Sequence, residues 1–245
     1  MITHLSRFVI VAVCVFLLVT PPSIATSDRT MEISEKDVAT LDHIGDYSDL
    51  RVLLIDCFEN LQSLPESIGK LTDLEELTVA YGHGNGCSMN PVLPETIGNL
   101  RSLRKLILYG AQDPRLHEHQ ERHAFPLSMS QLKNITYLDL GGNGLEDIPE
   151  FVKDLPKLRE IGFEYNELKE VPAFLSKLPV LTTLRLTGDD LNDFPDSLSA
   201  LPGLIRVTLG NNCRITQTPR KMKALQQRFP KVKFNFDDEY DCPAQ

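Results

Sequence analysis

The chain has 245 residues, of which 42% are hydrophobic and 24% are charged, and its formal net charge at pH 7 is −9. This length and apolar content provide for a sizeable core in one or two domains, so neither disorder nor a membrane-embedded fold is indicated. The acidic balance argues against a nucleic-acid binder, which needs a basic surface to displace counterions from phosphates.

The amino-terminal residues have the order of a secretory signal. A short basic start, "MITHLSR", leads into an apolar run from Phe8 to Thr20 and then into the small residues of "PPSIATS". The run is short for a membrane-spanning helix, which needs about 20 residues. We therefore predict a signal peptide over residues 1–25 and a secreted chain, extracellular or periplasmic, without a membrane span after its removal. An uncleaved anchor is the alternative.

The rest of the chain repeats one apolar pattern, in which hydrophobic residues recur at positions 0, 3 and 5, as in "LEELTV" and "LRKLIL". Eight such lines begin at Leu50, Leu74, Leu103, Ile135, Leu158, Leu181, Leu204 and Phe229. After irregular early steps, the lines from Ile135 to Leu204 follow one another every 23 residues. A fixed period of about 20–29 residues predicts a stack of repeats, each with a short parallel strand that points positions 0, 3 and 5 inward.

Two further features recur with the same period. The stretch "LPESIGKL" (64–71) is nearly copied as "LPETIGNL" (93–100), and a polar residue follows each later strand, at Asn143, Asn166, Asp189 and Asn212. Short polar side chains at such places hydrogen-bond the turning backbone. We interpret this ladder as structural, not catalytic.

Over about residues 44–236, this pattern resembles the leucine-rich repeat family, in its 23-residue "LPxxIGxLxxLxxLxLxxN" form known from Ras-group-related scaffold proteins and secreted bacterial proteins. The resemblance implies an α/β solenoid of about seven to eight repeats, a curved horseshoe whose concave parallel sheet binds a protein. We expect one domain over residues 26–245. "EISEKDVATLDHIGDYSDL" should form a helical cap at its amino end, and "PRKMKALQQRF" with "KVKFNF" should close the other end. The first three repeats depart from the pattern, because Phe58, Gly82 and Ala111 stand at the position where the pattern has asparagine.

Four cysteines remain after signal removal, an even number that suggests a disulfide framework in an exported chain: Cys57, Cys87, Cys213 and Cys242. Strands spaced by about 4.8 Å would separate Cys57 from Cys213 by roughly 29 Å, beyond bonding reach. We predict the pairs Cys57–Cys87 and Cys213–Cys242, with four separate buried thiols as the alternative.

Other candidate sites carry less weight. His83, His117, His119 and His123 lie in two insertions, which we interpret as solvated loops, not a metal site. No catalytic motif occurs, so we predict a non-catalytic protein without a cofactor. The sequon Asn134-Ile135-Thr136 offers Asn134 for glycosylation if the host attaches sugars there.

Outward strand positions predict a partner-binding patch, because tyrosine and arginine anchor protein interfaces. It is centred on Tyr109, Tyr137 and Tyr165, with glycines leaving gaps for a partner, and its full set is Tyr81, Arg104, Lys105, Tyr109, Tyr137, Asp139, Arg159, Glu164, Tyr165 and Arg185. The leading hypothesis is an exported recognition module for a protein, or for a glycan. A cell-envelope structural or enzyme-inhibitory protein is the alternative, and an intracellular Ras-type scaffold ranks third.

Overall fold

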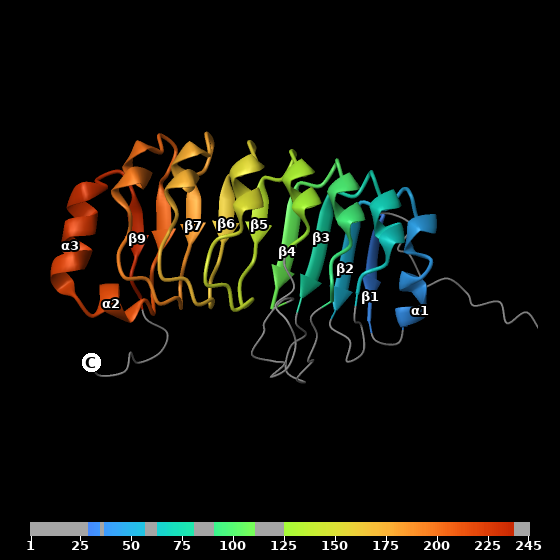
Figure 1. Cartoon of the computed structure of the whole chain (residues 1–245), viewed down its shortest axis with the longest axis horizontal. Coiled ribbons are helices and arrows are strands. Elements are labelled where there is room, and N and C mark those ends of the chain that lie inside the picture. The colour runs from blue at the N-terminus through green and yellow to red at the C-terminus, as the bar shows by residue number, and fades with distance from the viewer. Residues whose placement is uncertain (1–28, 35–36, 57–62, 81–90, 111–124, 238–245) are drawn as a thin grey trace, which may run out of the picture.

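The structure is a computed structural model that describes residues 29–34, 37–56, 63–80, 91–110 and 125–237. These residues form one 9-stranded sheet whose order in space is the order in sequence, from β1 to β9. Every neighbouring pair of strands is parallel. The described chain is therefore a stack of similar units, as Figure 1 shows from the blue to the red end.

The strands are β1 (Thr30–Ile33), β2 (Val52–Asp56), β3 (Glu76–Ala80), β4 (Lys105–Tyr109), β5 (Tyr137–Asp139), β6 (Glu160–Gly162), β7 (Thr183–Arg185), β8 (Arg206–Thr208) and β9 (Lys233–Asn235). Turns of 3-10 helix form the second layer: η2 (Ile44–Asp46), η3 (Glu66–Lys70), η4 (Glu95–Asn99), η6 (Leu127–Gln131), η7 (Glu150–Asp154), η8 (Ala173–Lys177) and η9 (Asp196–Ala200). The α-helices are α1 (Val38–Leu41), α2 (Cys213–Thr216) and α3 (Pro219–Arg228).

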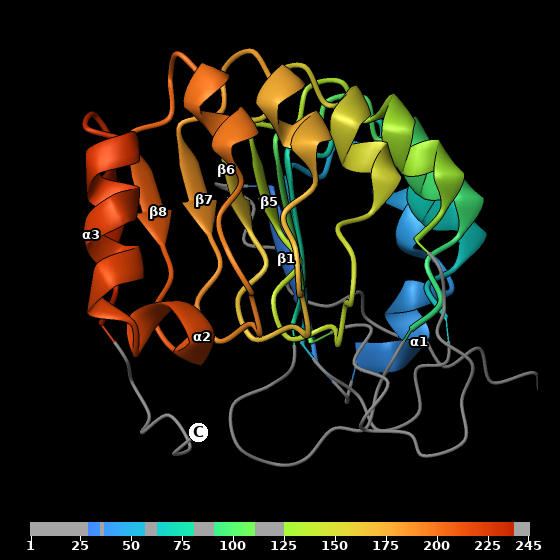
Figure 2. The same cartoon turned by 60° about the vertical axis from the view of Figure 1, so that its left-hand side comes forward.

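The hydrophobic core lies between the sheet and the η turns. The predicted inward positions of the first seven lines are all buried, and they meet across strands in register, for example Leu77 beside Leu106 and Leu138 beside Ile161. Each buried aliphatic side chain contributes about 1.5–3 kcal/mol of transfer free energy. Figure 2 shows the η turns on the outer side of the arc that the strands follow. We call the opposite face of the sheet the concave face.

The near-copied stretches form the η3 and η4 turns, and their glycine has a steric reason. A Cβ atom built on Gly98 would lie 2.5 Å from the backbone oxygen of Ser128 in the next turn. Gly69 is in the same situation beside Thr96. The η3, η4 and η6 turns approach each other too closely for a side chain at this position. Tight stacking of the turns therefore explains the glycine in the "IG" of the motif.

The polar ladder is buried and bonds the backbone, as the sequence predicted. Nδ2 of Asn166 donates to the carbonyl oxygens of Leu140, at 3.0 Å, and of Phe163, at 2.6 Å. Its Oδ1 accepts from the amide of Asn143 at 2.9 Å. Asn212 likewise donates to the Leu186 carbonyl at 2.6 Å. The ladder therefore ties each turn to its neighbours along the stack.

The ends of the stack differ from the sequence-based expectation. The amino-terminal cap contains a strand, β1, which pairs with β2 in parallel, and its helix α1 has only 4 residues. At the other end, Val207 pairs with Phe234, so the last strand is placed two residues away from the predicted line that begins at Phe229.

Phe229 is buried, as predicted, but it lies at the end of α3 and not at the start of the last strand line. Its ring packs edge-on against Phe194, with centroids 5.3 Å apart, and against Phe234 at 5.9 Å. Apolar spacing alone did not distinguish these arrangements, because a shift of two residues keeps side chains on the same face of a strand.

Candidate functional site

Four of the ten predicted partner-binding residues meet at the centre of the concave face, around the guanidinium group of Arg185. Its Nε donates to Glu164 at 2.9 Å, and one terminal nitrogen donates to the Tyr137 hydroxyl at 2.7 Å. The same nitrogen also bonds Glu160 at 2.9 Å, and the other forms a short contact with Asp139. We call these five residues the Arg185 network.

A missing side chain makes room for the Arg185 network. Asp139, Gly162 and Arg185 stand in register on three adjacent strands. A Cβ atom on Gly162 would come within 2.4 Å of the Arg185 guanidinium. Because Gly162 leaves this space open, Arg185 reaches across β6 to residues of β5, and its guanidinium carbon lies 5.3 Å from the centre of the Tyr137 ring.

The network is half-buried, and this governs its ionisation. Burial opposes the charge of Arg185, but the Tyr137 hydrogen bond and the Asp139 and Glu164 carboxylates outweigh it and raise the pKa of Arg185. Burial raises the pKa of Glu164, with the Arg185 charge acting in the opposite direction. Burial likewise raises the pKa of the Tyr137 hydroxyl. Arg185, which the sequence predicted to set charge complementarity at the edge of the patch, has its charge paired with carboxylates of the chain itself, and its role toward a partner stays a prediction.

Of the glycine gaps predicted at Gly110, Gly142 and Gly188, the one at Gly188 is filled by a tyrosine of the chain itself, because a Cβ atom there would lie 2.6 Å from the Tyr165 ring. Tyr109 lies in the same way against Gly141, at 2.5 Å, and in ordinary contact with a Cβ atom built on Gly142, at 3.5 Å. Tyr165 also has a positive φ of 59°, which is unusual for a residue with a side chain. Both rings are half-buried. They shape the floor of the concave face and do not leave openings beside it.

A shallow hollow of about 490 Å³ adjoins Tyr137 on the concave face. Lys105 lines it, pairs with Glu76 at 3.2 Å and lies 6.0 Å from the Tyr137 ring centre. Ile107, which sequence reasoning did not select, contributes a half-buried apolar side chain. The sequence signal that could have identified Ile107 is an apolar residue at an outward strand position. Half-buried Val52 and Leu54 in β2 stand at similar outward positions.

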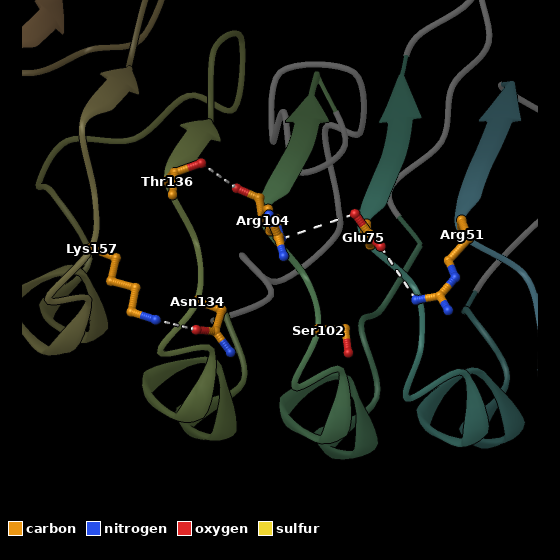
Figure 3. Close-up of a pocket in the computed structure, with 7 residues that line it drawn as sticks. All are labelled: Arg51, Glu75, Ser102, Arg104, Asn134, Thr136 and Lys157. Carbon is orange, nitrogen blue, oxygen red and sulfur yellow. Dashed lines mark hydrogen bonds and ion pairs between the residues drawn. The ribbon is translucent and has the colours of Figure 1, made fainter.

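A second hollow, of about 360 Å³, lies at the edge of the sheet where the strands begin and adjoins the first hollow. It is lined by polar residues of five successive units: Arg51, Glu75, Ser102, Arg104, Asn134, Thr136 and Lys157. Figure 3 shows these side chains side by side along the strand starts. Arg104, predicted as part of the central patch, lines both hollows, as do Glu75 and Thr136, and 68% of its side chain is exposed.

The remaining predicted residues are placed as follows. Arg159 is exposed at the start of β6, near the edge. The Asn134 side chain is engaged: its Nδ2 donates to the Arg101 carbonyl at 2.7 Å, and its Oδ1 accepts from Lys157 at 2.7 Å. Glycosylation there stays a prediction. Tyr81, at the end of the second predicted line, lies outside the described residues.

Cys213, the first residue of α2, is disulfide-bonded. Its pairing stays a prediction, because the other cysteines lie outside the described residues, as do the histidines of both insertions: Cys57, Cys87, Cys242, His83, His117, His119 and His123. Across the described ranges, no group of three or more His, Cys, Asp and Glu side chains is placed to hold a metal ion. None of the helices in those ranges is long and apolar enough to cross a membrane.

The stacked parallel sheet, the η turns and the asparagine ladder together define a leucine-rich repeat solenoid. Comparisons with solved structures find the same fold. A leucine-rich repeat protein of Leptospira interrogans is 24% identical, with a TM-score of 0.58 over 87% of this chain and 56% of that chain. Internalin C2 of Listeria monocytogenes is 23% identical, with a TM-score of 0.52 over 69% and 65%. Human 5T4, the trophoblast glycoprotein, is 19% identical, with a TM-score of 0.57 over 76% and 69%.

These similarities establish the fold, and the chain spans only about half to two thirds of the length of the two bacterial proteins. No model of a protein family matches the chain. No curated protein matches it either.

Proposed function

We propose that this protein is an exported, non-catalytic recognition module that binds a protein partner on its concave face. The observation that carries the proposal is the Arg185 network next to the hollow of about 490 Å³. It presents the ring of Tyr137, the cation of Lys105 and the apolar side chain of Ile107 on one fixed surface. Aromatic and apolar groups with charges at their border are typical of protein interfaces.

The comparisons add support of a general kind. The ectodomain of the plant receptor kinase GASSHO1/SCHENGEN3 of Arabidopsis thaliana, 22% identical with a TM-score of 0.50 over 75% of this chain and 20% of that chain, was solved in complex with Casparian strip integrity factor 2. A solenoid of this fold thus receives a partner in that protein. The partner of the present chain is defined here by chemistry alone: a protein with apolar groups and at least one anion for Lys105.

A pair of charge-matched variants tests the binding face. Residues 26–245 are immobilised and used to capture partners from culture medium or a periplasmic extract of the source organism. Lys105→Glu reverses a charge on the concave face, where 41% of the side chain is exposed. Lys177→Glu reverses a charge in the exposed part of η8. We expect Lys105→Glu to abolish capture and Lys177→Glu to preserve it; the opposite result would place the binding face among the η turns.

Export and the disulfide framework are part of the same proposal. The apolar run from Phe8 to Thr20 and the even number of cysteines support it. Amino-terminal sequencing of the exported protein is expected to begin at Thr26. Peptide mapping without reduction is expected to link Cys57 to Cys87 and Cys213 to Cys242. A product that retains residues 1–25, or a peptide linking Cys57 to Cys213, would refute these assignments.

A further inference from the structure

The edge hollow of about 360 Å³ has a composition unlike the concave face. Every side chain that lines it is polar, and three of them are cations, Arg51, Arg104 and Lys157, against the single carboxylate of Glu75. This local excess of positive charge is unexpected in a chain whose formal net charge is −9. A surface of that kind attracts anions, whereas the rest of the chain repels them.

The cations of the hollow are incompletely balanced by the chain itself. Glu75 is shared: it pairs with Arg51 at 3.2 Å and reaches Arg104 only at 4.0 Å. Arg51 has a second carboxylate, Asp73, at 3.5 Å. Lys157 bonds an amide oxygen, that of Asn134, and no carboxylate within the described ranges. Arg104 and Lys157 therefore keep donor capacity for a ligand, and both line the hollow, as Figure 3 shows.

The spacing of these two cations suggests the form of the ligand. Arg104 stands at the start of β4 and Lys157 before β6, two strands further along the stack. Two steps of about 4.8 Å across the sheet, with an offset of two residues along the strand direction, place their Cα atoms about 12 Å apart, on the order of the length of a disaccharide. Between them lie the hydroxyl and amide groups of Ser102, Asn134 and Thr136. No apolar side chain lines the hollow to receive the side chains of a peptide.

We propose that the edge hollow binds a linear saccharide that carries an oxyanion, a carboxylate or a sulfate, on alternate sugar residues. Arg104 and Lys157 would each bind one oxyanion through charge-assisted hydrogen bonds. Ser102 and Thr136 would bond the sugar hydroxyls between them. The edge hollow adjoins the concave-face hollow and shares Glu75, Arg104 and Thr136 with it, but the saccharide proposal does not depend on the protein-binding proposal, because its test uses saccharides alone.

The chain offers a charge-matched control for this site. Arg206 and Lys233 face each other on β8 and β9 at the far end of the sheet, both are exposed, and neither has an ion-pair partner among the described residues. Replacing both by glutamine removes the same two charges as replacing Arg104 and Lys157. A general electrostatic effect would weaken binding equally in the two double variants. Specific binding in the edge hollow would be weakened only by the replacement of Arg104 and Lys157.

The test is calorimetric titration of residues 26–245 with a sulfated chondroitin tetrasaccharide, at low and physiological salt. Maltotetraose, sodium sulfate and a hexaglutamate peptide serve as comparison probes. We expect the tetrasaccharide to bind best and maltotetraose not to bind. The variant with Arg104→Gln and Lys157→Gln should lose about tenfold or more in affinity. The variant with Arg206→Gln and Lys233→Gln should stay within about twofold, and thermal unfolding should verify that both are folded.

Several results would overturn the proposal. Equal affinities in the two double variants would place the anion elsewhere or make it a general charge effect. Hexaglutamate binding tighter than the tetrasaccharide would indicate an acidic protein segment, and sulfate binding as tightly as the tetrasaccharide would indicate a free anion. If no probe gives a heat of binding, the hollow does not bind saccharides and the proposal is wrong. None of these results decides the protein-binding proposal, which the Lys105→Glu variant tests.

Discussion

Asp189 is the member of the polar ladder that lacks an amide, and its replacement by asparagine is expected to stabilise the protein in a pH-dependent way. Oδ1 accepts from the Leu168 amide at 3.3 Å, but Oδ2 is buried without a hydrogen-bond partner. Burial raises the pKa of Asp189 to about 8, and the charge of Glu164 acts in the same direction. At neutral pH the folded protein therefore holds this carboxyl largely protonated.

The sign of the effect follows from the two pKa values. In the unfolded chain Asp189 releases its proton near pH 4, whereas the folded chain keeps it up to about pH 8. Between these values the folded state binds more protons than the unfolded state, so the free energy of unfolding falls as pH rises. The stability is complete below about pH 4 and the loss is complete above about pH 8.

The magnitude is set by the separation of the pKa values. Each unit is worth about 1.4 kcal/mol, which gives an upper bound of about 6 kcal/mol for the loss across this window. Relaxation of the turn and water penetration reduce the expected value to about 2–4 kcal/mol. In Asp189→Asn, the amide should donate to backbone carbonyls as Asn166 and Asn212 do. The gain should then be large at pH 8 and within about 1 kcal/mol at pH 4.

Urea unfolding at pH 4, 6 and 8 provides the measurement, with Asp190→Asn as the matched control. Asp190 is the next residue, exposed and paired with Arg214 at 3.1 Å, and its replacement should change stability by less than about 1 kcal/mol. If the stability difference between the parent protein and Asp189→Asn is the same at all three pH values, the carboxyl is not protonated in the folded state and the reasoning fails.

Three other predictions concern packing and charge. Gly98→Ala should destabilise the protein by about 1–3 kcal/mol in urea unfolding, because its Cβ would collide with the η6 backbone. Ser130 in η6 already has a Cβ, so the control Ser130→Ala should change stability very little. Arg185→Gln should cost about 1–3 kcal/mol at pH 7 and less in acid, because burial raises the pKa of Glu164, one of its carboxylate partners; equal losses would contradict the charge argument. Phe229→Ala should cost about 3–5 kcal/mol, and a loss under 1 kcal/mol would contradict the assigned core position.

The fold was predictable because its stabilising interactions repeat along the chain. Every unit must bury the same strand positions against its neighbours, so the apolar lines and the 23-residue spacing appear directly in the sequence. The first and last units have a neighbour on one side only, so they are not required to repeat the same pattern. Val52 pairs with Thr30 of a strand that has no apolar line of the repeat type, and α3 brings Phe229 into the core from a helix. The errors in prediction therefore lie where the repeat lacks a neighbour.

The candidate site was predictable in direction but not in contacts. Strand alternation gave the outward positions of Tyr137, Asp139 and Arg185. It did not show that Arg185 bonds Tyr137, which is 48 residues away in the sequence. That contact depends on the reach of the Arg185 side chain across Gly162, whose contribution, the space left by a missing side chain, is not visible in the sequence. A glycine between an aspartate and an arginine at the same strand position is the signal that was available.

The structure divides the predicted patch into residues that hold the surface in shape and residues that a partner can reach. Arg185 has 19% of its side chain exposed and Asp139 has 10%, and their hydrogen bonds are already made within the chain. A partner could bond them only by breaking those contacts. Lys105, with 41% of its side chain exposed, has a single carboxylate partner, Glu76, among the residues that the structure describes. Binding energy should therefore come from Lys105, Ile107 and the exposed side of the Tyr137 ring, while Arg185 acts by holding that ring in place.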